Sequence, residues 1–458
     1  MRLDRHNTWT DIHGAPPWFL KYVARHLSVQ VELGTKKGAR FGLLWKHQGM
    51  LYGSLLHNNR VPAGLTPHLT QLVQHYNLHA EIHDHRVPPL RLSPPMDLVN
   101  MNWRPYQNRV QAALLAHPTG VIDASPRSGK TAMAARIIDT LNLPTVCLAP
   151  SVQIVRQTYE KYLGFFGSDL VARLDGSAKP HERDSSKHIV VTTHQSALAL
   201  PQEWWDTRKV LVIDEFHHAA ADSYHRISHL ARFAYYRYGF TGTHFRTGDD
   251  HLSMEAISSN SLYKVNVSNL VEQGYLASPR VVFFPVRGKV KARDWKVAYA
   301  RGIVASAERN KLVVGLANQL VELGYPTIVL TRHRKHADEL GSRIDGAAVV
   351  KGGENALTSR VVKEFADGQH PCLVGTTVIG EGVDIPRASA LVFASGGRPG
   401  VGQIQSYFRP LTASPGKHEG LIYDFFDVTH TTLRRHAAQR YLKAQQIFGA
   451  ENCSIQER

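Results

Sequence analysis

The chain has 458 residues, of which 43% are hydrophobic and 20% are charged, and its formal net charge is +16. This composition excludes a disordered chain, and the sequence has no run of about 18 apolar residues that would indicate a membrane span. Two or three domains are expected because the length exceeds one ordinary core. The positive charge favours a polyanionic partner, with nucleic acid as the leading candidate and a merely basic soluble protein as the alternative.

The N-terminal sequence and the cysteines bear on location. The opening MRLDRHNTWTDIHG lacks the apolar core of a signal peptide. The three cysteines, Cys147, Cys372 and Cys453, are far apart and match no zinc-binding spacing. We therefore expect a protein of the reducing cytoplasm with no membrane partner.

Residues 1–97 are predicted to form a separate small α/β domain. The segment FGLLWKHQGMLYGSLL is typical of two strands joined by a turn, and TPHLTQLVQHYNL places Leu69, Leu72, Val73 and Tyr76 on one side of a helix. The prolines of RVPPLRLSPPMD then predict a stiff linker. Ten of the 26 histidines lie in this region, and we expect them to be solvated surface residues rather than metal ligands.

From Asn102 onward, short apolar runs alternate with helical segments. TGVIDA, TVCLAP, HIVVTTH and KVLVIDE are continuous in the way that is typical of strands buried in a parallel sheet. The alternation restarts with PTIVLT, PCLVGTT, ALVFAS and GLIYDFF, and TTLRRHAAQRYLKAQQIF is expected to pack as a basic amphipathic helix. The fold class is therefore α/β, with two parallel-sheet domains at 98–278 and 279–458.

The stretch DASPRSGKT lies between a predicted strand and a predicted helix, where a phosphate-binding loop belongs. Backbone N–H groups at a helix N-terminus attract phosphate. Lys130 can reach the β- and γ-phosphates, and the Thr131 hydroxyl can bind Mg²⁺. Ala124 stands where the pattern has its first Gly, which costs little provided that the residue keeps a β conformation. The alternative is a chance match to Gly-Lys-Thr.

Two adjacent acids follow about 85 residues later. The apolar strand of KVLVIDEFHHAA delivers Asp214 and Glu215 at its carboxyl end. Asp214 is expected in the Mg²⁺ shell, and Glu215 is expected to orient the attacking water of in-line phosphoryl transfer. Paired acids at a strand tip can also be plain surface residues, but the upstream loop argues against that. ATP and Mg²⁺ are the expected cofactors.

Together with the phosphate loop, seven further segments resemble the motifs of superfamily 2 helicases of the DEAD/DEAH kind, over about residues 102–428. In chain order they are WRPYQ, APSVQIVRQ, VVTTHQS, DEFH, GFTGTHFR, VGTTVIGEGVDIP and QIQSYFRPLT. The order and spacing make the match specific. The resemblance implies two tandem RecA-like domains and a nucleic-acid-dependent ATPase.

The resemblance also implies roles for individual residues. Those implied in catalysis are Lys130, Asp214, Glu215, His217, Gln405 and Arg409. Those implied in nucleotide binding are Arg104, Gln107, Ser128, Gly129, Lys130 and Thr131, with Thr131 and Asp214 at the metal. Those implied in nucleic-acid contact are Gln153, Arg156, Thr193, Gln195, Arg246, Thr376 and Thr377. Those implied in coupling nucleotide state to domain closure are Thr241, Gly242, Thr243, Gly380, Gly382 and Asp384.

The last motif departs from the family pattern, which is typically Gln-x-x-Gly-Arg-x-x-Arg. Phe408 replaces the Gly, and Thr412 replaces the final Arg, which is the usual arginine finger. Three readings stay open: Arg409 acts alone, another cation such as Arg398 reaches in, or turnover is slow. We favour Arg409 with reduced turnover. Arg127 also replaces a common Gly, and its side chain is expected to point outward.

The N-terminal region resembles the leading domain of phage branch-migration helicases of the UvsW kind, and XPB-type DNA helicases carry a comparable domain. The resemblance rests on LYGSLLHNNRVPAGLTPHLTQLVQHYNLHAEIHDHR. It implies a domain that engages branched or distorted duplex, and a DNA helicase or translocase, 3′→5′ in polarity, that serves recombination, repair or replication. The expected partner is branched or forked DNA with single-stranded regions, bound by a monomer in the cytoplasm (the host's if a phage encodes the chain).

Three other functions remain open. The chain could be a motor that moves on duplex without separating its strands, an RNA helicase, or a weakly catalytic nucleic-acid clamp. The altered last motif favours the clamp, whereas Lys130, Thr131, Asp214 and Glu215 oppose it.

Overall fold

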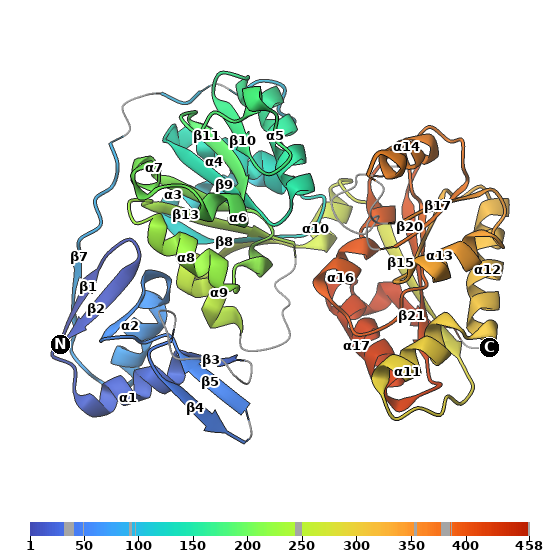
Figure 1. Cartoon of the computed structure of the whole chain (residues 1–458), viewed down its shortest axis with the longest axis horizontal. Helices are drawn as coiled ribbons and strands as arrows, with labels where there is room; N and C mark the ends of the chain where they lie inside the picture. The colour runs from blue at the N-terminus through green and yellow to red at the C-terminus, as the bar shows by residue number, and fades with distance from the viewer. Residues whose placement is uncertain are drawn as a thin grey trace. The chain divides into compact units, whose positions relative to one another are not determined.

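The computed structural model describes residues 1–31, 41–48, 50–90, 94–96, 98–242, 250–351, 355–376, 385 and 387–456. The chain divides into two compact units, one of Met1–Ser125 with Gly129–Val265 and the other of Pro126–Ser128 with Asn266–Arg458 (Figure 1). The main break falls at Val265–Asn266, whereas the sequence placed its boundary between residues 278 and 279. Within the described ranges, none of the helices combines the length and the apolar character of a bilayer-spanning segment.

Among the described residues of 1–84, two small sheets and two α-helices form the N-terminal module. Its elements are β1 (Arg2–Arg5), β2 (Trp9–His13), α1 (Pro17–His26), β3 (Ser28–Val31), β4 (Leu44–His47), β5 (Met50–Ser54), β6 (Arg60–Pro62), η1 (Ala63–Leu65), α2 (Thr66–His75) and β7 (Glu81–Asp84). One sheet has the order β6-β2-β1-β7, in which β7 runs parallel to β1 and the other neighbours are antiparallel. The other is the antiparallel sheet β3-β5-β4. The predicted helix is α2, which buries Leu69, Leu72 and Val73.

The core of this module continues into a helix of the domain that follows it. In helix α9 (Asp250–Ser258), Ala256 belongs to the same buried cluster as the module's Leu3, Phe19 and Leu69. Gly64 lies so close to α9 that an added Cβ would come within 1.9 Å of the Glu255 carbonyl oxygen. The module therefore packs directly against α9 of the first sheet domain.

The first sheet domain has one seven-stranded parallel sheet with the order β10-β11-β9-β12-β13-β8-β14. Its strands are β8 (Thr119–Ala124), β9 (Thr145–Ala149), β10 (Val171–Leu174), β11 (Ile189–Thr193), β12 (Val210–Ile213), β13 (Tyr236–Thr241) and β14 (Ser261–Val265). Besides α9, its helices are α3 (Gln107–Ala116), α4 (Lys130–Leu141), α5 (Val152–Phe166), α6 (His194–Leu198), α7 (Gln202–Thr207) and α8 (Asp222–Leu230), with η2 (Pro180–Glu182) and η3 (Phe216–His218). Every residue of β9, β11, β12 and β13 is buried, which explains their continuous apolar runs.

The second unit repeats this plan with the strand order β17-β18-β16-β19-β20-β15-β21, again all parallel. Its strands are β15 (Ser278–Val286), β16 (Thr327–Leu330), β17 (Ala347–Val350), β18 (Cys372–Gly375), β19 (Ala390–Phe393), β20 (Glu419–Asp427) and β21 (Cys453–Ile455). Its helices are α10 (Val267–Glu272), α11 (Trp295–Tyr299), η4 (Ala300–Val304), α12 (Ala307–Glu322), α13 (Arg334–Gly341), α14 (Asn355–Ala366), α16 (Val401–Tyr407), η5 (Arg409–Leu411), α17 (Thr431–Phe448) and η6 (Ala450–Asn452). The predicted C-terminal helix is α17, and it packs on β20. The α/β class with two parallel-sheet domains is confirmed.

A buried ion-pair network joins α17 to the end of β20. Arg440 Nε lies 2.8 Å from Asp424 Oδ2 with both side chains almost fully buried, and Arg440 also donates to the carbonyls of Gly397 and Phe425. The Tyr407 hydroxyl donates to Asp424 as well. The helix of the last motif, α16, is thereby held against β20 through its final residue.

The network yields a prediction about stability. Arg440→Ala leaves the buried Asp424 carboxylate without its main cation, so the free energy of unfolding of the second unit should fall by about 3–5 kcal/mol. The matched control is Arg343→Ala, because Arg343 pairs with Glu339 at 3.8 Å while both side chains are more than 40% exposed; a change below about 1 kcal/mol is expected there. Urea unfolding followed by hydrogen exchange of β20 measures both, and equal losses would contradict the assignment.

Candidate active site

The phosphate-loop segment connects the end of β8 to the start of α4. Ala124 ends β8 fully buried and without a positive φ, so the condition under which Ala can replace Gly there is met. Two later residues are left-handed, Arg127 with φ +71° and Gly129 with φ +77°. The value at Arg127 explains why Gly is common at this position, and a non-Gly residue there carries strain of about 1–3 kcal/mol.

Gly129 is also required by a close contact with Gln107. A Cβ on Gly129 would lie 2.6 Å from Gln107 Nε2. Gln107 is 1% exposed at the start of α3, and its Oε1 accepts a hydrogen bond from the backbone N–H of Arg104 at 2.9 Å. The structure thus places Gln107 beside the loop, and Arg104 contacts Gln107 through its backbone N–H. Adenine recognition by Gln107 and Arg104 stays a prediction.

Lys130, Glu215 and His217 lie next to one another at the carboxyl edge of the sheet. Lys130 Nζ lies 3.8 Å from Glu215 Oε1, and His217 Nδ1 lies 3.3 Å from Glu215 Oε2. Glu215 is left-handed, with φ +45°. Its N–H donates to Asp214 Oδ1 at 2.9 Å, while the Asp214 N–H donates to the carbonyl of Leu148. The turn after β12 therefore fixes both carboxylates next to the loop lysine.

The environment of Asp214 disfavours its charge. Burial raises the pKa of Asp214 to about 6, the neighbouring Glu215 carboxylate adds to the rise, and the Lys130 ammonium partly offsets it. A cation bound next to this carboxylate would stabilise its ionised form, which burial otherwise disfavours. The position is the one at which Mg²⁺ binding was predicted.

Asp214, Lys130 and Thr131 line one small cavity of the first sheet domain. Its other lining residues are Ala134, Cys147, Leu148, Ala149, Thr158, Tyr162, Val191, Val212 and Phe240. Sequence reasoning missed Cys147 and Tyr162, and no sequence signal marks them. Burial raises the pKa of the Cys147 thiol to about 12, so Cys147 is an apolar wall rather than a reactive group.

The predicted nucleic-acid contacts of the first sheet domain differ in their exposure. Gln153 and Arg156 are exposed on α5, where Arg156 forms a loose ion pair with Glu160. Gln195 is exposed on α6, but Thr193 is buried and its hydroxyl accepts from the N–H of Ser196 at 3.2 Å as the cap of α6. Contact of all four with nucleic acid stays a prediction.

The residues predicted to couple nucleotide state to closure are only partly described. Thr241 ends β13 fully buried and pairs in register with Asp123 of β8, so it lies one strand away from the loop, and Gly242 follows it half-buried. The coupling residues Thr243, Gly380, Gly382 and Asp384 lie outside the described ranges, and so do two of the predicted nucleic-acid contacts, Arg246 and Thr377. Thr376, also a predicted nucleic-acid contact, follows β18 and is buried.

The altered last motif has a structural explanation in the second unit. Phe408 is 2% exposed, and its ring packs on Phe448 of α17 with centroids 5.2 Å apart. Thr412 forms a β-bridge with Leu276. Arg409 begins η5 and is buried, Gln405 is half-buried in α16, and Arg398 is exposed. The two substituted positions thus serve packing and backbone pairing, and the finger role of Arg409 stays a prediction.

Comparison with known proteins gives matches to both sheet domains. The family model described as type III restriction enzyme, res subunit, matches residues 100–246, and the helicase conserved C-terminal domain matches residues 308–398. The DNA 3′-5′ translocase XPB2 of Sulfurisphaera tokodaii is 23% identical over 66% of this chain and 76% of that protein. The ATP-dependent DNA helicase uvsW of Enterobacteria phage T4 is 19% identical over 72% of this chain and 69% of that protein. The Hef helicase domain of Pyrococcus furiosus superposes with a TM-score of 0.51 at 18% identity, over 75% of this chain and 98% of that one.

Two RecA-like parallel sheets, with a phosphate loop and an Asp-Glu pair in the first, define a nucleic-acid-dependent ATPase. The chain belongs to the superfamily 2 helicases, and within them it resembles UvsW and XPB.

The raised pKa of Asp214 predicts a pH dependence of stability. Its folded value near 6 exceeds the ordinary value near 4, so the native state holds the extra proton between these pH values, and the stability contributed by this group falls as the pH rises through that window. Asp214→Asn should therefore raise the free energy of unfolding of the first unit at pH 7.5 by about 1–3 kcal/mol, with the gain shrinking toward pH 4.

The control for this prediction is Asp169→Asn, which makes the same chemical change at an exposed residue of the same domain. It should alter stability by less than about 0.5 kcal/mol at every pH. Denaturant titrations from pH 4 to 7.5 compare the two variants with the unmodified protein. A pH-independent effect of Asp214→Asn would show that its ionisation carries no penalty.

Proposed function

We propose that the chain is an ATP-driven DNA helicase or translocase that acts 3′→5′ on branched or forked DNA. The observation that carries the proposal is the meeting of Lys130, Asp214 and Glu215 beside a phosphate loop at one edge of a parallel sheet. The names of the relatives support DNA as the nucleic-acid substrate, since XPB2 is named a DNA 3′-5′ translocase and uvsW a DNA helicase. The net charge of +16 supports a polyanionic partner.

The residues present fit a magnesium-bound triphosphate. Gly129 gives the loop its left-handed turn at the start of α4, Lys130 supplies an ammonium group, and Thr131 and Asp214 supply oxygen ligands at the same cavity. Mg²⁺ would supply charge neutralisation of the β- and γ-phosphates when bound. Lys130 would bind the same phosphates, and Glu215, which His217 contacts, would orient the attacking water.

The N-terminal module is the proposed source of the preference for branched DNA. Its resemblance to the leading domains of branch-migration helicases supports this role. Deletion of residues 1–97 is a poor test, because the module shares its core with α9 and its removal would expose the face that carries Leu252 and Ala256. Comparison of DNA substrates with the full chain tests the preference without that damage.

The duplex translocase that does not separate strands is the second candidate, because the relative XPB2 is named a translocase. Strand displacement from a labelled fork distinguishes it from a helicase. The clamp is disfavoured by the intact charges at the site, and the RNA helicase is disfavoured by the names of the relatives.

Nucleic-acid-stimulated ATP hydrolysis is the decisive measurement. We expect the strongest stimulation by forked or four-way DNA, less by single strands and least by duplex RNA, with a log–log slope of DNA affinity against salt of about −0.9 per phosphate neutralised. Lys130→Ala should reduce hydrolysis by about 100-fold or more while DNA binding remains. Stronger stimulation by RNA, or DNA binding independent of salt, would overturn the choice of partner.

A separate prediction concerns the altered last motif. If Arg409 provides the missing cation, Arg409→Ala should lower the single-turnover rate of ATP hydrolysis by about 10³-fold, whereas Arg398→Ala should leave it within about twofold. Circular dichroism and ADP affinity check that the Arg409→Ala protein remains folded. An unchanged rate in Arg409→Ala, or a larger loss in Arg398→Ala, would remove Arg409 from this role.

A further inference from the structure

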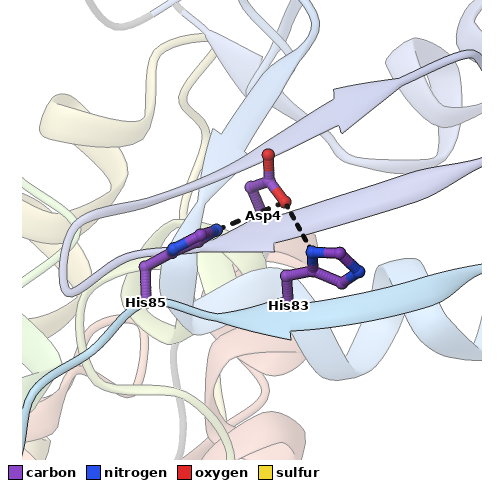
Figure 2. Close-up of side chains that lie close together, drawn as sticks. All are labelled: Asp4, His83 and His85. Atoms are coloured by element: carbon purple, nitrogen blue, oxygen red, sulfur yellow. Dashed lines mark ion pairs between the residues drawn. The ribbon is translucent and has the colours of Figure 1, made fainter.

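One face of the module's four-stranded sheet gathers histidines around a single carboxylate. Side chains two residues apart share a face of a strand, and the parallel register pairs Asp4 of β1 with His83 of β7. His85, two residues beyond His83, has its N–H bonded to the carbonyl of Arg5. Figure 2 shows that Asp4, His83 and His85 point toward one another, although 79 residues separate Asp4 from His83 in the sequence.

The two oxygens of Asp4 have different environments. Oδ2 is held by Arg2 Nη2 at 3.0 Å and by His13 Nε2 at 3.1 Å. Oδ1 is buried and makes no hydrogen bond within the part of the chain that the structure describes. His85 Nε2 at 3.4 Å and His83 Nδ1 at 3.9 Å face Oδ1 (Figure 2). The residue as a whole is 9% exposed, so a buried carboxylate oxygen is aimed at two imidazole nitrogens.

Both histidines are positioned from their outer sides. The ring of His85 stacks on the ring of His6 with centroids 5.0 Å apart and an interplanar angle of 11°. The other ring nitrogen of His83, Nε2, faces Glu81 Oε2 at 3.6 Å. A carboxylate on the far nitrogen is the usual outer partner of a metal-bound histidine, because it fixes the tautomer that leaves a lone pair toward the metal.

The separations suit a small transition-metal ion. Ligands at about 2.0–2.1 Å in a tetrahedral site are about 3.3 Å apart. The two imidazole nitrogens lie 3.4 and 3.9 Å from Asp4 Oδ1, and all three donor atoms lie within 4.8 Å of one another, so side-chain rotations can bring them to that value. The donor set of two imidazoles and one carboxylate favours Zn²⁺ and its neighbours over Mg²⁺, which prefers oxygen ligands alone.

We propose that Asp4 Oδ1, His83 Nδ1 and His85 Nε2 bind one divalent transition-metal ion, with Zn²⁺ as the chemically best matched, and that a fourth position stays open to water. The ion ties the edge strand β7 to β1. Within the described ranges β7 is an edge strand that pairs with β1, and it precedes the connection to the first sheet domain. Bound metal therefore stabilises the end of the module at which that connection begins. This site is independent of ATP hydrolysis.

The test uses the untagged full chain, stripped with a chelator, in buffer with millimolar Mg²⁺. Titration with Zn²⁺ is followed by calorimetry, and titration with Co²⁺ by its visible absorption, which is intense only in a tetrahedral site. One ion should bind per chain, and the melting temperature should rise with Zn²⁺. Asp4→Asn, His83→Gln and His85→Gln should each weaken Zn²⁺ binding by at least tenfold.

Matched controls are His47→Gln and His79→Gln, which remove exposed histidines of the same module outside the cluster; they should bind Zn²⁺ as the unmodified chain does. Melting temperatures with chelator present check that each variant is folded. The proposal fails if no stoichiometric ion binds, if the cluster variants bind as tightly as the controls, or if the tetrahedral Co²⁺ absorption is absent. In those cases the cluster is an ion-pair network of Asp4 with its histidines.

Discussion

Two carboxylates and one ammonium group share the carboxyl edge of the first sheet, and the rest of the site depends on keeping them there. Parallel pairing supplies the place, because β8 and β12 end at the same edge and deliver Lys130, Asp214 and Glu215 from turns 84 residues apart in the sequence. Burial makes the ionised form of Asp214 unfavourable and so raises its pKa, and the nearby Lys130 ammonium offsets this effect only in part. A site with this balance is poised for a ligand that brings both negative phosphates and a divalent cation.

The same arrangement explains why strained backbone lies where it does. Arg127 and Glu215 are non-glycine residues in the left-handed region, one in the phosphate loop and one directly after Asp214. Both residues stand close in sequence to side chains that line the cavity, Arg127 three residues before Lys130 and Glu215 directly after Asp214. Strained backbone of this kind persists where the surrounding structure fixes it, and it is common at ligand sites. Gly129 is left-handed without strain, but its lack of a side chain is needed for a second reason, the approach of Gln107. The loop is thus fixed by contact as well as by conformation.

Much of the fold was predictable, and the reason is local. The strands β9, β11 and β12 are buried on both faces, which requires continuous apolar runs, and such runs in the sequence predict central strands of a parallel sheet. Lys130, Asp214 and Glu215 could be predicted because each lies just after an apolar strand, at the place where phosphate-binding and metal-binding residues belong in a parallel sheet. The contact of Gln107 with Gly129, the wall made by Cys147 and Tyr162, and the grouping of Asp4 with His83 depend on strand order and register, which a single sequence does not contain. The histidines of the module were accordingly expected to be ordinary surface residues.

The packing of the N-terminal module constrains how any motor action of this chain can work. Ala256 and Leu252 of α9 lie in or against the module's core, and His68 Nε2 lies 2.6 Å from Glu255 Oε2 across the same junction. Core packing of this density transmits displacement rather than absorbing it. If the module engages a DNA branch, as proposed, that contact moves with the sheet that carries Lys130 and Asp214. The change in DNA contact that the proposed motor needs in each ATP cycle would then occur elsewhere than at this junction, because separating α9 from the module would expose apolar surface at each cycle.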